Sequence, residues 1–116
     1  MIKIYGIKNC DTMKKAFVWL DKHKIKYSFH NYKELGIDPD TIELWLKKIP
    51  MDQLINMKST TWRELSEETK KSISNQKKAI ALMMENTSVI KRPLVVFGKD
   101  KYLLGFKVEE WEKQLA

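Results

Sequence analysis

The stretch that decides the fold is Ile2-Lys3-Ile4-Tyr5-Gly6-Ile7-Lys8-Asn9-Cys10-Asp11-Thr12-Met13-Lys14-Lys15. It predicts a short buried strand, a turn at Gly6 and then an amphipathic helix. Apolar residues spaced i, i+3, i+4 and i+7 indicate that helix; they are Met13, Ala16, Phe17 and Leu20. Residues of types that cap helix starts surround Cys10, so the helix is expected to begin near this cysteine. The only cysteine of the sequence therefore lies where a strand is followed by a helix.

Cys10 is a candidate reactive thiol because of this position. The first turn of a helix carries backbone N–H groups without helical partners and the positive end of the dipole, and both favour a thiolate. Lys8, Lys14 and Lys15 are close in sequence and should also lower the pKa of the thiol. The opposing interpretation is that Cys10 is a small buried side chain, which is the common fate of cysteine. The position between strand and helix favours the reactive thiol.

The length and composition indicate one globular domain of 116 residues. No apolar run approaches the length of a membrane span, and the N-terminus lacks a signal-peptide pattern. A single cysteine excludes an internal disulfide, which fits a reducing cytoplasm. With His23 and His30 as the only histidines, zinc-ligand spacing is absent from the sequence, and we predict no metal site.

The net charge of +7 does not by itself indicate nucleic-acid binding. The lysines are dispersed along the chain, and no basic run is interleaved with aromatic residues. We therefore expect most lysines on solvated helix faces and do not expect direct binding to nucleic acid.

The first part of the chain is predicted to be strand, helix, strand. Residues 1–5 form the first strand and residues 11–23 the helix. A second strand follows, where Ile25, Tyr27 and Phe29 alternate with polar residues. This order is a βαβ unit with parallel strands. Cys10 then lies at the carboxyl end of the first strand, where ligands bind in such units.

Residues 37–86 are predicted to be a compact helical insertion. Asp38-Pro39 starts a helix that Pro50 stops. Thr61 and Glu64 have the spacing of a capping box for a further helix.

The last part of the chain is predicted to be a hairpin and a final helix that contains Trp111. The whole is therefore predicted to be a single α/β domain of residues 1–116 with a thioredoxin-like core. That core takes residues 1–34 and 88–116, and the helical insertion lies between its second and third strands.

Motifs along the whole chain resemble the arsenate reductase (ArsC)/Spx family, and most closely its YffB-like branch. They occur in the family's order and are Ile4-Tyr5-Gly6, Asn9-Cys10-Asp11-Thr12, Lys15-Ala16, Trp62-Arg63, Lys91-Arg92-Pro93-Leu94-Val95 and Gly105-Phe106. The resemblance implies a thioredoxin-like fold with a helical insertion.

The resemblance also implies roles for individual residues. In arsenate reductases of the family, a cysteine at the position of Cys10 attacks arsenate, and arginines bind the oxyanion. Arg92 matches one arginine and precedes Pro93, which resembles the cis-proline of thioredoxin folds. A second arginine falls at Lys58 and a third about where Gly105 stands. Lysine is a poorer geometric substitute for a bidentate donor, and glycine supplies none, so these departures count against true arsenate reduction.

The Spx regulators of the family sense oxidation through a CxxC pair of cysteines. Met13 occupies the fourth position of that motif here, so an intramolecular redox switch is impossible. The alternative function is therefore an Spx-like module that binds RNA polymerase without chemistry. It predicts that Cys10→Ser leaves the interactions of the chain intact.

The main function that the resemblance implies is a thiol-dependent reductase or transferase with Cys10 as nucleophile. Because no second cysteine exists, glutathione or another small thiol would have to resolve Cys10. Arg92 and Lys58 would bind an anionic part of the substrate, and the Thr12 hydroxyl would donate to the thiolate. Pro93 would place backbone groups beside the sulfur for an extended thiol ligand. We expect a monomer with no bound cofactor.

Overall fold

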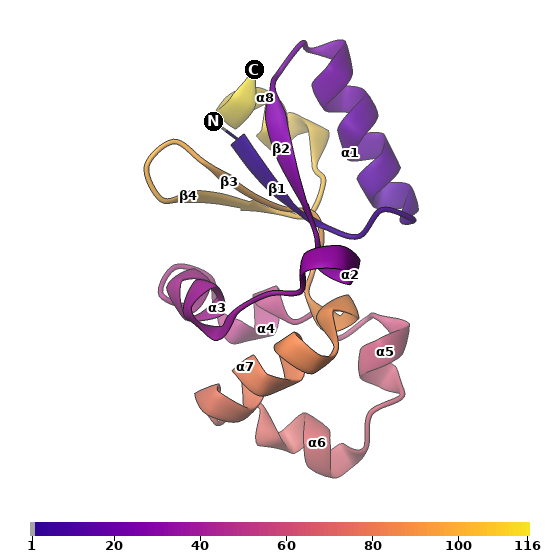
Figure 1. Ribbon diagram of the computed structural model, residues 1–116, viewed down its shortest axis with the longest axis vertical. Coiled ribbons are helices and arrows are strands. Elements are labelled where there is room, and N and C mark those ends of the chain that lie inside the picture. The colour runs from indigo at the N-terminus through magenta and orange to yellow at the C-terminus, as the bar shows by residue number, and fades with distance from the viewer. Residues whose placement is uncertain (1) are drawn as a thin grey trace. The chain divides into compact units, whose positions relative to one another are not determined.

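The computed structural model describes residues 2–116, which form two compact units (Figure 1). The first unit contains the residues up to Leu35 together with Arg92–Ala116, and the second is Gly36–Lys91. Within residues 2–116, every helix is too short or too polar to cross a membrane.

The first unit is built on a four-stranded sheet with the order β2-β1-β3-β4. β1 (Ile2–Gly6) pairs in parallel with β2 (Tyr27–Asn31), which confirms the predicted strand–helix–strand unit. β3 (Leu94–Phe97) pairs antiparallel with both β1 and β4 (Lys101–Leu104), so the predicted hairpin is also confirmed.

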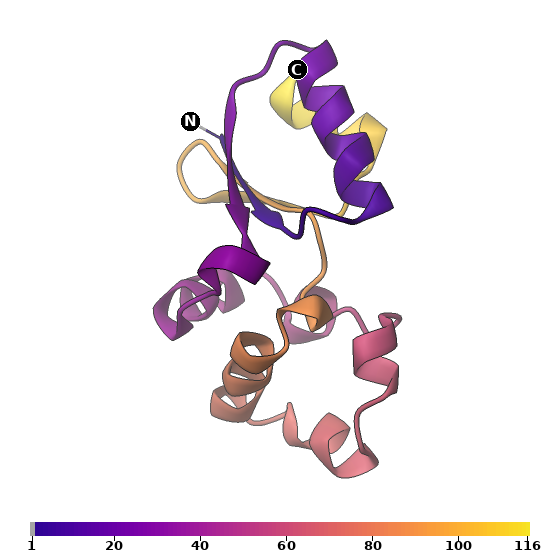
Figure 2. The same ribbon diagram turned by 45° about the vertical axis from the view of Figure 1, so that its right-hand side comes forward.

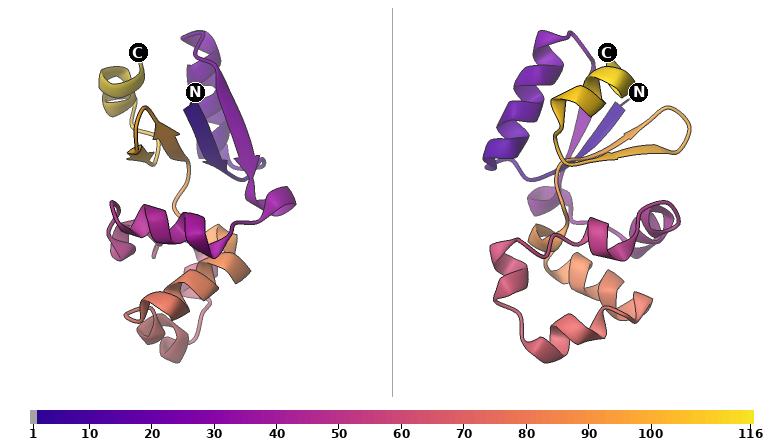
Figure 3. Two further views of the ribbon diagram at one scale, coloured as in Figure 1. Left: turned by 60° about the vertical axis from the view of Figure 1, so that its left-hand side comes forward. Right: turned by 180° about the vertical axis from the view of Figure 1, so that it is seen from behind.

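One face of this sheet carries the hydrophobic core of the first unit. Ile4 lies opposite Phe29 on one side and Val95 on the other, and Val95 in turn faces Leu103, so the register aligns one apolar row. α1 (Asp11–Lys22) and α8 (Val108–Leu115) pack on this row, as Figures 2 and 3 show.

The two helices meet through aromatic rings. The rings of Trp19 and Trp111 touch edge to face with centroids 5.5 Å apart. Trp111 is fully buried, and its Nε1 donates a hydrogen bond of 3.1 Å to the carbonyl oxygen of Gly105. The indole thereby satisfies its polar group while its ring fills the core.

Gly6 is not the turn that the sequence predicted. It is the last residue of β1 and lies opposite Asn31 of β2. A Cβ atom at Gly6 would lie 2.5 Å from the Met13 sulfur, so the glycine makes room for a buried side chain of α1. Close approach of the helix, and not a turn, therefore requires glycine here.

The second unit is helical and is linked to the first unit by the short α2 (Tyr32–Leu35), which belongs to the first. Its helices are α3 (Pro39–Leu46), α4 (Met51–Leu54), α5 (Thr60–Arg63), α6 (Glu67–Ser72), α7 (Gln76–Glu85) and the 3-10 turn η1 (Thr87–Val89). Ile42, Leu54, Met83 and Ile90 are among its fully buried side chains.

Polar caps start most of these short helices. Asp38 accepts the N–H of Thr41 at 2.7 Å and begins α3 at the predicted place. The predicted capping box of Thr61 and Glu64 is wrong, because α5 begins at Thr60 and Ser59 accepts the N–H of Trp62. Ser59 stands three residues before that N–H, the separation an N-cap side chain needs, whereas Glu64 already follows the helix.

Candidate active site

Cys10 occupies the N-cap position of α1, directly before its first helical residue. Its backbone is extended, and its carbonyl oxygen accepts the N–H of Lys14 at 2.9 Å, the first hydrogen bond of the helix. The thiol is only partly exposed. The helix start that the sequence predicted is confirmed, and it places the sulfur beside the first N–H groups of α1.

Arg92 reaches this sulfur from the next strand of the sheet. The register pairs Tyr5 with Leu94, so Pro93 and Arg92 continue beside the end of β1, close to where Cys10 follows. The Arg92 side chain lies close enough to Cys10 to lower the pKa of its thiol, as a hydrogen-bond donor and as a positive charge. Two residues that are far apart in sequence thus meet because β1 and β3 are neighbours.

The contacts around the sulfur favour the thiolate. Burial by itself raises the pKa of Cys10, but hydrogen bonds from the Arg92 side chain and from the backbone N–H groups of Met13 and Thr12 lower it. The positive charge of Arg92 acts in the same direction, and the pKa of Cys10 lies below that of an ordinary thiol.

Pro93 lies between Arg92 and β3, and the Arg92–Pro93 peptide bond is cis. The carbonyl oxygen of this buried proline accepts the N–H of Gly105 at 2.8 Å. Gly105 has a left-handed φ of +80°, a conformation that favours glycine. The position where the resemblance led us to look for a third arginine thus serves the backbone around Pro93.

The other two predicted residues differ in where they lie. Thr12 is the second residue of α1, and its backbone N–H is the group that acts on the sulfur. The role predicted for its hydroxyl stays a prediction. Lys58 lies in the second unit, exposed in the turn before α5, where its N–H donates to Asn56 at 3.1 Å. Its predicted role in anion binding stays a prediction as well.

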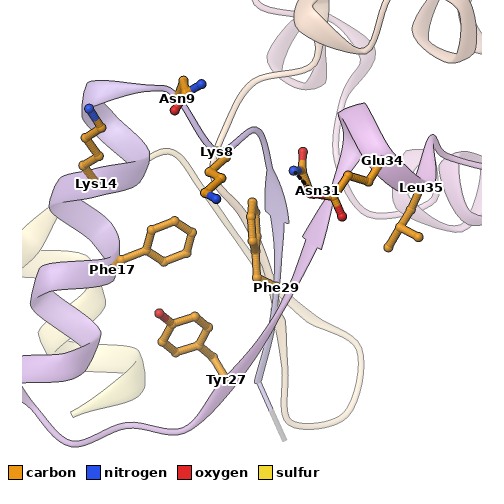
Figure 4. A pocket seen from close by; sticks show the side chains of 9 residues that line it. All are labelled: Lys8, Asn9, Lys14, Phe17, Tyr27, Phe29, Asn31, Glu34 and Leu35. Carbon is orange, nitrogen blue, oxygen red and sulfur yellow. Dashed lines mark hydrogen bonds between the residues drawn. The ribbon is translucent and has the colours of Figure 1, made fainter.

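The sequence did not predict a pocket of about 500 Å³ between α1 and β2 (Figure 4). We call it the α1–β2 pocket, and its lining residues are Lys8, Asn9, Lys14, Phe17, Tyr27, Phe29, Asn31, Glu34 and Leu35. The sequence signal for this pocket was the alternation of Tyr27 and Phe29 in the second strand, together with Phe17 on the apolar face of the first helix. That pattern indicates a buried face and does not distinguish a packed core from an open pocket.

Known proteins resemble the chain over nearly its full length. The profile of the ArsC family matches residues 5–114. An uncharacterized protein of Haemophilus influenzae is 40% identical over 116 residues, which is all of both chains. The global transcriptional regulator Spx of Listeria innocua is 24% identical over 95% of this chain and 83% of its own.

Solved structures agree with this assignment. A protein named YffB is 42% identical and matches with a TM-score of 0.93 over the whole of both chains. An arsenate reductase (ArsC) related protein from Brucella melitensis is also 42% identical, with a TM-score of 0.77 over 97% of this chain and 92% of its own. These matches confirm the predicted α/β, thioredoxin-like fold with helices between the second and third strands. The chain belongs to the ArsC family.

Proposed function

We propose that the chain is a thiol-dependent reductase or transferase in which Cys10 is the nucleophile. The observation that supports this most is the position of Cys10 at the start of α1, where the nearby Arg92 side chain lowers the pKa of the thiol. The thiolate is the nucleophilic form of cysteine, and both features favour it.

The proposed reaction is a two-step thiol–disulfide exchange. The Cys10 thiolate attacks one sulfur of a disulfide R–S–S–R′, forms Cys10–S–S–R and releases R′–S⁻. A small thiolate G–S⁻, glutathione or another small thiol, then attacks the sulfur of R, forms G–S–S–R and restores the Cys10 thiolate. When R is the same small thiol, the product is its symmetric disulfide, and R′ has been reduced. The outside thiol is needed because the sequence has no second cysteine.

The neighbours of Cys10 would divide the remaining work. Arg92 would hold an anionic group of the incoming small thiol next to the sulfur of Cys10. Pro93, fixed by the hydrogen bond from Gly105, would position the thiol ligand. Lys58 would help to bind the anion, and the Thr12 hydroxyl would donate a hydrogen bond to the thiolate. Such a reaction needs a reducing compartment, so we place it in the cytoplasm, carried out by a monomer.

The test is the pH dependence of Cys10 alkylation by iodoacetamide. We expect an apparent pKa below the ordinary value of about 8.5 in the unaltered chain, and a higher value in Arg92→Ala. The matched control is Arg63→Ala, which removes the only other arginine, an exposed one in the second unit, and should leave the pKa unchanged. An apparent pKa at or above 8.5 in the unaltered chain would overturn the proposal.

The relatives named Spx support a second candidate function, a transcription-regulating module that binds RNA polymerase without chemistry. Several such regulators are 24% to 26% identical to this chain over at least 95% of its length. Capture of RNA polymerase subunits by both the unaltered chain and Cys10→Ser would support this candidate. Absence of capture, together with glutathione-dependent turnover that Cys10→Ser abolishes, would support the enzyme.

A further inference from the structure

We infer that the α1–β2 pocket binds an aromatic carboxylate that is part of the substrate attacked by Cys10. This inference rests on the proposed function and goes beyond it, because it names a substrate class and a second binding region. A volume of about 500 Å³ falls in the range of pockets that hold small organic ligands.

The walls of the pocket favour an aromatic ring. The rings of Phe17 and Tyr27 are nearly parallel, 13° apart in plane, with centroids separated by 5.5 Å. Phe29 meets Phe17 edge to face at 5.0 Å. Figure 4 shows the three rings around one space, with Lys8 at its upper end. A planar apolar group can pack against such rings face to face or edge to face.

The charges of the pocket favour an anionic substituent on that ring. Lys8 and Lys14 line it, and neither forms an ion pair with any residue from 2 to 116. The one carboxylate of the lining, Glu34, accepts a hydrogen bond of 3.3 Å from the Asn31 side-chain amide. The two ammonium groups therefore outnumber a carboxylate that already has a polar partner. A carboxylate on the ligand would complement them through charge-assisted hydrogen bonds.

The pocket begins next to Cys10. Asn9 precedes the cysteine, and Lys14 and Phe17 follow it by four and seven residues, which places them on the same side of α1. At a rise of 1.5 Å per residue, Phe17 lies about 10 Å along the helix axis from Cys10. The occupant must therefore carry its ring within about 10 Å of the reacting sulfur, a length that suits an aryl disulfide.

The first experiment compares two reagents on the full chain. Dithionitrobenzoate has a carboxylate on each aromatic ring; the Cys10 thiolate attacks one of its sulfurs, forms a mixed disulfide and releases the other aryl thiolate. Methyl methanethiosulfonate is small and neutral; the same attack transfers its methylthio group and releases methanesulfinate. The quantity compared is the rate constant with dithionitrobenzoate divided by the rate constant with methyl methanethiosulfonate, both at one pH. A change in the thiolate fraction alters both rate constants equally, so this ratio reports only how the pocket favours the aromatic reagent.

We expect this ratio to fall several-fold in Lys14→Gln and about tenfold when Lys8→Gln is added, since each lysine supplies a charge-assisted contact. Lys15→Gln is the matched control, because Lys15 is an exposed neighbour on α1 that does not line the pocket. Its ratio should stay unchanged at about 0.15 M salt, which screens distant charges. If Cys10 still reacts in every variant but the ratio is the same in all of them, the inference is overturned. A slow reaction of the unaltered chain with methyl methanethiosulfonate would instead count against the proposed function.

The second experiment removes the chemistry. Cys10→Ser is titrated with the methyl thioether of nitrobenzoate, which cannot exchange, and backbone NMR shifts are followed. We expect the largest shifts at Phe17, Tyr27 and Phe29, and weaker binding in Phe17→Leu. Shifts confined to other parts of the chain, or none at millimolar concentrations, would overturn the inference whether or not Cys10 is a nucleophile.

Discussion

The two sides of Cys10 differ in chemistry, although both are built from one sheet. On the β3 side, Arg92 places a permanent positive charge and a hydrogen-bond donor on the sulfur. On the β2 side, the α1–β2 pocket offers aromatic rings and the ammonium groups of Lys8 and Lys14. β1 lies between the two sides.

This difference separates two properties that a single site often combines. The Arg92 side governs how much thiolate is present, because its contact lowers the pKa of Cys10. Cys10 does not line the α1–β2 pocket, so in our proposal the pocket governs which molecule reaches the thiolate. Changes on the two sides should therefore have separable effects.

The largest expected effect is that of Cys10→Ser, which removes the centre of the comparison. We expect glutathione-dependent reduction of hydroxyethyl disulfide to fall to the uncatalysed background, since the sequence holds no other thiol. The fold should persist, because serine is close to cysteine in size and the position is only partly buried. Circular dichroism is the control for folding. Turnover that survives in a folded Cys10→Ser would mean that neither side of Cys10 matters to the activity.

Arg92→Ala should lower the reaction rate on both reagents by the same factor. Without the guanidinium, burial raises the pKa of Cys10 with less opposition, so the thiolate fraction at a pH below both pKa values falls about tenfold for each unit of pKa. At pH values above both pKa values the rates should converge. Stopped-flow rates with dithionitrobenzoate and methyl methanethiosulfonate measure this.

The same comparison can contradict the separation of the two sides. A selective loss with the aromatic reagent in Arg92→Ala would show that Arg92, and not the α1–β2 pocket, holds the carboxylate. Arg92→Lys keeps the charge but not the planar donor. The pKa of Cys10 in this variant should therefore lie between its values in the unaltered chain and in Arg92→Ala.

The parts of the site that the sequence predicts are those set by local pattern. The helix start at Cys10 follows from the spacing of Met13, Ala16 and Leu20, and all three are buried. The parallel pairing of β1 and β2 follows from the short connection through one helix. Local periodicity fixes such elements because each is stabilised mainly by burying one face.

Local sequence patterns do not predict contacts between residues that are far apart in the sequence. Nothing in the residues around Arg92 indicates that its side chain meets Cys10; the resemblance to the family did so. Phe17, Tyr27 and Phe29 show the same alternation whether they meet a partner or border a pocket. Gly6 was misassigned for a similar reason, because the atom that requires a glycine there belongs to Met13, on another element.

Gly6→Ala should affect both the stability of the fold and the pKa of Cys10. The added methyl group meets Met13, whose fully buried side chain must move, and such overpacking costs about 1–3 kcal/mol of unfolding free energy. The backbone N–H of Met13 also helps to lower the pKa of Cys10, so displacing this residue should raise that pKa. Urea denaturation and the alkylation profile measure the two effects.

Met13→Ala supplies the control for this change. With the Met13 side chain shortened, Gly6→Ala should cost much less, so the two substitutions should be non-additive. Additive free energies of unfolding would mean that the methyl group at Gly6 strains something other than Met13.

The smallest expected effect is a pH dependence of stability that belongs to the Arg92 side alone. The pKa of Cys10 is lowered in the folded chain, so the thiolate contributes stability that is fully present above the unfolded pKa of about 8.5. That contribution is lost as the pH falls through the folded pKa. The free energy of unfolding, measured with urea under reducing conditions, should therefore rise from pH 5 to pH 9 more in the unaltered chain than in Cys10→Ser. Arg92→Ala should reduce this excess, and Phe17→Leu, which changes no charge, should leave it intact. Parallel curves for the unaltered chain and Cys10→Ser would show that the contacts at the sulfur do not favour the thiolate.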